Sequence, residues 1–246
     1  MADVVSVTGF ILSSMPVGDY DRRVVILSRE LGKIAAFAKG ARRPNSHLIG
    51  VTRPFIFGTF EVYRGRDSYT IQKANVTNYF EELVSDLDGV LYGYYFAELA
   101  EYYGRENLDA ADMINLLYVA FKALVNKSLP NELVRYIYEI RLIAVNGESP
   151  DFFSCAGCGS EKELQLYSYK ENGMYCVECA ASSGDGIVLQ SSTLYTLQYI
   201  ITAPLTKLFN FVVKADVLNE LKKVVNRIEF ITFDKHFKSK EMLDIG

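Results

Sequence analysis

The sequence predicts an α+β multidomain protein, in which an N-terminal five-stranded β-barrel is followed by an α-helical domain with an embedded four-cysteine module. Short runs of Val, Ile, Phe and Tyr, typical of strands, fill residues 4–75. After Tyr79, apolar residues recur three and four positions apart, as in amphipathic helices. All the cysteines lie within residues 155–179. We therefore place the barrel in residues 1–78, the helical domain in residues 79–246 and the cysteine module at about residues 151–185.

The barrel is predicted from five strand-like runs, at residues 4–12, 22–28, 33–39, 53–63 and 68–74. Gly32 and Gly65 mark turns between them. Five strands of this length suit the OB-fold, a small barrel that commonly binds single strands or oligosaccharides. An SH3-like barrel or an open sheet would give much the same pattern.

Helices are predicted at residues 79–104, 111–126 and 131–147, where Glu, Asp and Lys separate the apolar positions. A second helical stretch begins near Ser191, is broken by Pro204 and resumes near Ala215. No apolar run reaches the roughly 18 to 20 residues that a membrane span needs. The first residues also lack the basic region of a secretory signal. We therefore expect a cytoplasmic protein with no membrane segment.

The cysteines follow the spacing C-x2-C-x17-C-x2-C, which is a recognised zinc pattern. They are Cys155, Cys158, Cys176 and Cys179. Between the two pairs, "LQLYSY" and "GMYC" predict a hairpin that brings the pairs together. A reducing cytoplasm favours metal over two disulfides or four unconnected thiols. Four thiolates fill a tetrahedron, so we expect one structural Zn2+ with no open position for catalysis.

The net charge of −4 is unevenly distributed. The first 80 residues hold eleven Lys and Arg against six Asp and Glu, a net charge of +5, and the remainder holds 15 against 24, a net charge of −9. A polyanion would therefore bind the first third of the chain and be repelled by much of the rest.

The densest basic segment is "LSRELGKIAAFAKGARRPNSHLIGVTRPF", residues 27–55. Its two predicted strands lead to Lys39 and then to a loop that carries Arg42 and Arg43. Cations on such a loop can neutralise phosphates without reading bases. From charge alone, a solubilising surface loop is an equally good interpretation.

Catalytic motifs are missing from the sequence. It has no G-x-x-x-x-G-K-[ST] loop, no G-x-S-x-G elbow and no H-E-x-x-H pair. The two histidines, His47 and His236, lie in polar or basic segments and are expected at the surface. Without a base paired to a nucleophile, or a metal with an open position, we expect a binding protein rather than an enzyme.

Several segments resemble the RecO family of bacterial recombination mediators, whose N-terminal barrels carry a "GK…AKGARR…S" signature. The matching segments are "SRELGKIAAFAKGARRPNSHLIG", "DLDGVLYGYYFAELAEYY", "YIYEIRLIAVNGESPDFFSCAGCG" and "DKHFKSKEML". They follow the family's order over nearly the whole chain. The segment "PVGDYDRRVVILS" departs from it, because the family often has a Gly-Glu-Ser-Asp type of turn there.

The resemblance implies an OB-fold, a central helical domain and a zinc module held by the four cysteines. It also implies a nucleoid-associated, non-enzymatic protein of the RecF pathway of DNA repair. Such a protein binds single- and double-stranded DNA, anneals complementary strands, contacts the C-terminal tail of SSB and, with RecR, helps to load RecA on gapped DNA. An alternative is a zinc-containing adaptor for protein interactions that binds DNA weakly or not at all, and the filled coordination sphere disfavours a zinc hydrolase.

Carried onto this sequence, the resemblance makes the residues of its basic signature the best candidates for DNA contacts: Lys33, Lys39, Arg42 and Arg43. Four more join them on charge and expected barrel position: Arg22, Arg23, Arg64 and Arg66. Phe37, Phe55 and Tyr63 are candidates for stacking on bases, although most aromatic side chains of so small a barrel are expected in its core. An apolar groove between helices is expected to take the SSB tail.

Overall fold

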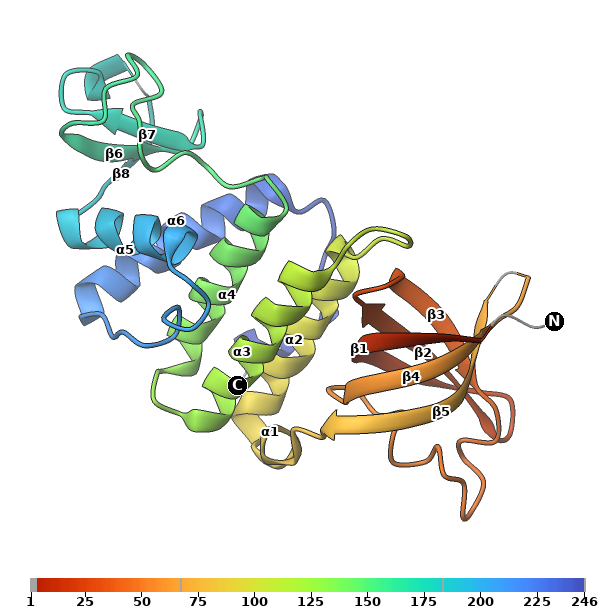
Figure 1. Ribbon diagram of the computed structural model, residues 1–246. Coiled ribbons are helices and arrows are strands. Elements are labelled where there is room, and N and C mark those ends of the chain that lie inside the picture. The colour runs from red at the N-terminus through yellow and green to blue at the C-terminus, as the bar shows by residue number, and fades with distance from the viewer. Residues whose placement is uncertain (1–3, 67, 183, 246) are drawn as a thin grey trace. The chain divides into compact units, whose positions relative to one another are not determined.

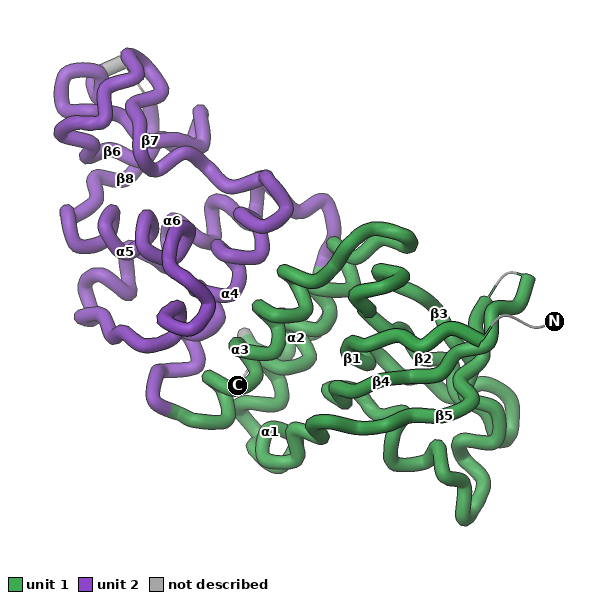
Figure 2. The backbone as a smooth tube through the Cα atoms, viewed as in Figure 1, with its two compact units in different colours: residues 1–127, 237–246 green, residues 128–236 purple. Residues whose placement is uncertain are grey.

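The computed structural model describes residues 4–66, 68–182 and 184–245. The chain forms two compact units, which Figure 2 shows in different colours. Unit 1 comprises residues 1–127 and 237–246, and unit 2 comprises residues 128–236.

The first part of unit 1 is a closed five-stranded barrel (Figure 1). Its strands are β1 (Val4–Val17), β2 (Asp21–Ser28), β3 (Gly32–Ala38), β4 (Phe57–Arg64) and β5 (Tyr69–Asn78). The order around the barrel is β1-β2-β3-β5-β4, and only the β3–β5 pairing is parallel. This confirms the OB-fold. Strand β1 is longer than predicted, since an irregularity between Ile11 and Ser13 lets it pair with β4 at one end and β2 along the other.

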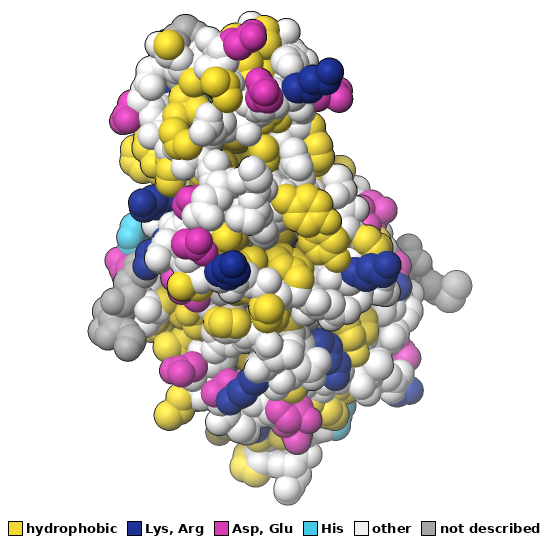
Figure 3. Space-filling model, turned by 90° about the vertical axis from the view of Figure 1, so that its left-hand side faces the viewer, with side chains coloured by type: hydrophobic (Ala, Val, Ile, Leu, Met, Phe, Trp, Pro, Cys, Tyr) yellow, Lys and Arg dark blue, Asp and Glu magenta, His cyan; other side chains and the backbone are white. Residues whose placement is uncertain are grey.

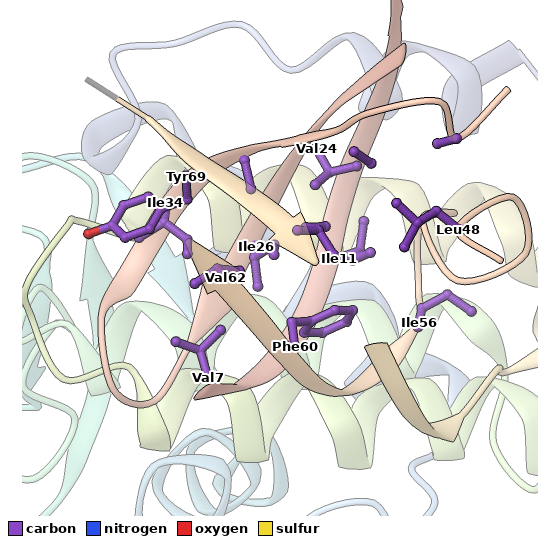
Figure 4. Packing of buried hydrophobic residues seen from close by; sticks show 14 residues of the cluster. Val7, Ile11, Val24, Ile26, Ile34, Leu48, Ile56, Phe60, Val62 and Tyr69 are labelled. Carbon is purple, nitrogen blue, oxygen red and sulfur yellow. The ribbon is translucent and has the colours of Figure 1, made fainter. Parts of the chain in front are cut away.

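The barrel core follows from the alternation of side chains along each strand. In β3, Ile34, Ala36 and Ala38 are buried, whereas the residues between them are only half-buried. Figure 4 shows the apolar side chains of the barrel strands pointing into one shared interior, which Leu48 and Ile56 from the loop before β4 also enter. The intervening side chains are therefore left to face outward, where they are covered by helices or meet solvent.

Four helices complete unit 1: α1 (Glu81–Ser85), α2 (Leu87–Tyr103), α3 (Ala111–Asn126) and α7 (Lys238–Ile245). The single helix predicted at residues 79–104 is two, because Asp86 has an extended backbone. Helix α3 packs on the barrel through Phe121, whose ring centre lies 5.4 Å from that of Phe10 in β1. Helix α7 packs on α2, where Ser239 donates its backbone N–H to Glu98 over 3.0 Å.

Unit 2 consists of α4 (Asn131–Val145), β6 (Leu164–Ser168), β7 (Gly173–Cys176), η1 (Ala180–Ser182), β8 (Gly186–Val188), α5 (Ser191–Thr202) and α6 (Ala215–Thr232). The predicted hairpin is β6–β7, and β8 adds a third strand that the sequence did not predict. A buried ion cluster joins two helices: Arg135 of α4 lies 2.7 Å from Glu139 and 3.4 Å from Glu229 of α6.

The last barrel strand ends at Asn78, where the barrel domain is predicted to end, but compact unit 1 continues to Lys127. The helices α1, α2 and α3 thus group with the barrel rather than with α4, α5 and α6. The division at residue 78 stays a prediction. Among the described residues, no helix is both long and apolar enough to cross a membrane.

Candidate nucleic-acid interface and metal site

Two segments that are separate in sequence are joined at one end of the barrel. The carboxylate of Asp21 accepts a hydrogen bond of 2.7 Å from the backbone N–H of Gly40. The backbone N–H of Arg42 donates to the carbonyl of Tyr20 over 2.8 Å, and its guanidinium donates to the carbonyl of Gly18 over 3.2 Å. These bonds fix the loop that follows β3 against the turn between β1 and β2. Tyr20 and Asp21 were not predicted as site residues, although they lie in the segment that departs from the family pattern.

This arrangement collects basic side chains, which we call the loop cluster: Arg23, Lys39, Arg42 and Arg43. All are exposed. The guanidinium of Arg43 lies 5.1 Å from the ring centre of Tyr20. Within the described residues, no carboxylate lies within 4.0 Å of any of these cations. The cluster therefore presents positive charge that the fold itself does not neutralise.

Arg22 lies beside the loop cluster but is half-buried. Its guanidinium donates to the hydroxyl of Ser14 over 3.1 Å. Lys33 is elsewhere on β3, and its ammonium donates to the carbonyl of Glu101 in α2 over 2.7 Å. A phosphate would have to compete with that hydrogen bond, so a DNA contact by Lys33 stays a prediction. Its structural role is to link β3 to α2.

Arg64 and Arg66 are exposed and line a different hollow of about 330 Å3. Other polar side chains around it include Tyr69 and Glu106, which share a hydrogen bond of 3.3 Å donated by the Tyr69 hydroxyl. Burial, with Glu106 beside it, raises the pKa of Tyr69 even though Arg64 acts to lower it. The structure thus brings Arg64 and Arg66 together, but at the β4–β5 turn rather than in the loop cluster.

The aromatic candidates separate into two kinds. Phe55 is 1% exposed, and its ring centre lies 4.8 Å from that of Tyr94 and 5.3 Å from that of Phe121. The prediction that Phe55 can stack on bases is wrong, because helices α2 and α3 cover it. Phe37 and Tyr63 are half-buried on the outer face of the barrel.

The four cysteines of unit 2 come together as predicted. Their sulfur atoms all lie within 4.8 Å of one another, and none is in a disulfide. The Sγ atoms of Cys158 and Cys176 are 3.8 Å apart. A tetrahedral Zn2+ with bonds of about 2.3 Å would place its sulfur ligands about 3.8 Å apart, so the geometry fits a metal ion of this kind.

The local backbone also suits a metal-binding knuckle. Gly159 has a φ of 74°, which favours glycine, and its N–H donates to the carbonyl of Cys155 over 2.8 Å. The N–H of Cys176 points at the sulfur of Cys155 over 3.3 Å. Cys155 and Cys176 are buried, Cys179 is half-buried and Cys158 is exposed, so three of the four ligands are at least partly shielded from solvent. The four-thiolate set can hold a metal, and it leaves no open position for a substrate.

An apolar groove that the sequence could not locate lies beside α5. It has a volume of about 510 Å3, and its walls include Tyr195, Tyr199, Phe211, Val212 and Lys214. Figure 3 shows the side of the molecule that carries α5, and hydrophobic side chains gather in the middle of that face. Tyr195 is 67% exposed and Val212 is 73% exposed. We call this feature the α5 groove.

Comparison with known proteins gives evidence for the family of this chain that is independent of the site geometry. The family profile described as Recombination protein O N terminal matches residues 1–80, and the profile described as Recombination protein O C terminal matches residues 84–241. A protein of Acetivibrio thermocellus named DNA repair protein RecO is 30% identical over 241 residues, which cover 96% of this chain and 94% of that protein. Proteins of the same name from Oceanobacillus iheyensis and Bacillus subtilis are 28% and 27% identical and are covered to 92% of their length.

Proposed function

Because the chain belongs to the RecO family, with a role in DNA repair and recombination, we propose that its barrel binds single- and double-stranded DNA through the loop cluster. The observation that carries the proposal is the set of exposed cations at Arg23, Lys39, Arg42 and Arg43, held on two segments that hydrogen bonds join. Lys and Arg neutralise phosphates and release counterions, which gives binding without sequence preference.

The same charge supports strand annealing without any bond being made or broken. Two DNA strands repel each other through their phosphates, and a basic surface that contacts both lowers this repulsion. No catalytic group is needed for this. We propose that the protein acts as a recombination mediator, which works with RecR and SSB to load RecA on gapped DNA at the nucleoid of the cytoplasm.

We further propose that Cys155, Cys158, Cys176 and Cys179 hold one structural Zn2+. The sulfur cluster and the 3.8 Å separation of two of its members support this. Bound zinc would tie the segment before β6 to the end of β7, and so stabilise the small sheet of unit 2.

For the C-terminal tail of SSB, we propose the α5 groove as the docking site. Exposed apolar side chains, such as Tyr195 and Val212, offer area that a peptide can bury. Lys214 at the same groove gives a cation for the carboxylate that ends any C-terminal tail. The groove belongs to the acidic part of the chain, so DNA would not compete for it.

The experiment that tests the proposed function is annealing of complementary strands coated with SSB by the purified protein. We expect annealing that is faster than the spontaneous reaction and that slows as salt is raised, since phosphate contacts carry the binding. A protein that neither anneals nor binds an oligonucleotide at about 50 mM salt would instead be an adaptor for protein interactions.

A further inference from the structure

The strand register places one row of side chains across the outer face of the barrel. Arg23 of β2 pairs with Phe37 of β3, Phe37 pairs with Thr70 of β5, and Thr70 pairs with Tyr63 of β4. Their neighbours along the strands, including Ala36 and Val62, lie in the barrel core. Side chains alternate between the two faces of a strand, so the members of this row point outward.

The outward-pointing rings of Phe37 and Tyr63 lie outside the aromatic interface between the barrel and its helices. Helices α2 and α3 pack on the barrel chiefly through β1 and β2. The aromatic contacts of that interface are made by Phe10, Phe55 and Phe57 with Tyr94, Tyr118 and Phe121. Phe37 and Tyr63 have no part in these aromatic contacts, and both residues are half-buried.

Basic side chains lie near both ends of the row. Arg23 is opposite Phe37 across the strand pair, and Lys39 lies two residues beyond Phe37, directly after the end of β3. At the other end, Arg64 follows Tyr63 directly and is exposed; as the next residue of β4, it points away from the face that carries Tyr63 and lines the hollow with Arg66. The row thus connects the loop cluster with the hollow at Arg64 and Arg66. Aromatic rings set between cations are the composition of a surface that binds single strands.

We infer that Phe37 and Tyr63 stack on unpaired bases, so that this row holds a single strand and discriminates it from a duplex. Two strand spacings, roughly 10 Å, separate the backbones that carry the two rings. Stacked bases in a duplex rise by only about 3.4 Å, and their faces are covered by neighbouring bases. A nucleic acid whose bases stack on both rings must therefore be unpaired. The inference rests on the proposed DNA-binding function and adds strand preference to it.

The test compares binding of a labelled single strand and a duplex of the same sequence, at one salt concentration, for the variants Phe37→Leu and Tyr63→Leu. Each variant is expected to bind the single strand about tenfold more weakly and to bind the duplex as the wild type does. Phe37→Trp and Tyr63→Phe keep a ring and should keep the affinity for the single strand. Phe230→Leu, which removes a 77% exposed ring of unit 2 outside the α5 groove, is the matched control.

A second measurement does not depend on how well the leucine variants fold. Single strands that contain 5-iodouracil form crosslinks with stacked aromatic side chains under long-wavelength light. We expect the crosslinked peptide to contain Phe37 or Tyr63. Crosslinks confined to other segments would overturn the inference. Leucine variants that lose affinity for the single strand and the duplex equally, or for neither, would also overturn it. If these variants bind as the wild type does while Arg42→Glu with Arg43→Glu weakens both kinds of DNA, stacking is refuted and the proposed function stands. If the wild-type protein binds neither the single strand nor the duplex, the stacking inference and the proposed function are both refuted.

Discussion

The guanidinium of Arg43 lies 5.1 Å from the centre of the Tyr20 ring, in unit 1. The two residues come from different loops, and the backbone hydrogen bond from Arg42 to Tyr20 helps to hold those loops together. A cation over the face of a ring keeps its charge and its N–H donors. This contact therefore orients a cation of the loop cluster without neutralising it.

Replacing Tyr20 is expected to loosen Arg43 and to weaken DNA binding modestly. A cation–π contact at an exposed site stabilises by about 0.5–1 kcal/mol, so Tyr20→Leu should lower affinity by about two- to fivefold. Tyr20→Phe keeps the ring and should bind as the wild type does. Fluorescence anisotropy with a labelled oligonucleotide measures both, and equal losses in the two variants would show that the hydroxyl, rather than the ring, matters.

Removing one sulfur ligand is expected to release the metal. Cys176→Ser should lose the bound zinc and the protection of β6 and β7 against proteolysis, because closed four-thiolate sites contribute on the order of 10 kcal/mol to the folding of their own module. The control is Ser154→Ala, which alters the same segment without removing a ligand. Elemental analysis of reduced wild type should give one zinc per chain, and much less than one would contradict the assignment.

The ion cluster of unit 2 predicts a dependence of stability on pH. Burial, followed by the charge of Glu229, raises the pKa of Glu139 from 4.5 to about 8, although Arg135 acts to lower it. Between pH 4.5 and about pH 8, the folded chain therefore keeps a proton on Glu139 that the unfolded chain has released. The free energy of unfolding should fall as pH rises through this range.

The variant Glu139→Gln tests that prediction, because an amide resembles the protonated carboxyl and does not titrate. Urea unfolding followed by circular dichroism, at about pH 6 and about pH 9, should show a smaller alkaline loss of stability in the variant than in the wild type. An identical loss in both proteins would mean that Glu139 does not hold the proton.

The α5 groove predicts where a partner peptide binds. Val212 is 73% exposed, so Val212→Asp should fold normally. A charge in an apolar contact is costly to desolvate, and binding of a peptide with the SSB tail sequence should weaken by about tenfold or more. Binding of DNA and zinc should not change. A peptide that binds this variant and the wild type equally well must dock elsewhere.

Local pattern predicted most of the fold. Strands such as β2 and β3 show apolar residues at the positions that face the core, and Pro204 correctly marked the interruption between α5 and α6. The break at Asp86 was missed because the apolar period continues across it. Strand β8 has only three residues, too few to show any period.

The site was less predictable, because it depends on contacts between distant residues. Nothing local indicates that the carboxylate of Asp21 binds the N–H of Gly40, 19 residues away. Phe55 follows Arg53 and Pro54 in a segment between two strands, yet helices from later in the chain bury it. The cysteine spacing was the exception, since two short pairs and a hairpin already define a four-ligand cluster.

The most direct test of the account is the salt dependence of DNA binding by wild type and by Arg42→Glu with Arg43→Glu. If the wild type contacts four or five phosphates, its affinity should fall by roughly two orders of magnitude between 50 and 200 mM salt, and the variant should bind more weakly with a shallower slope. Lys170→Glu with Lys223→Glu makes the same charge change on exposed residues of unit 2 and should leave binding unchanged. If the Arg42 and Arg43 variant binds as the wild type does at every salt concentration, the loop cluster is not the DNA-binding site.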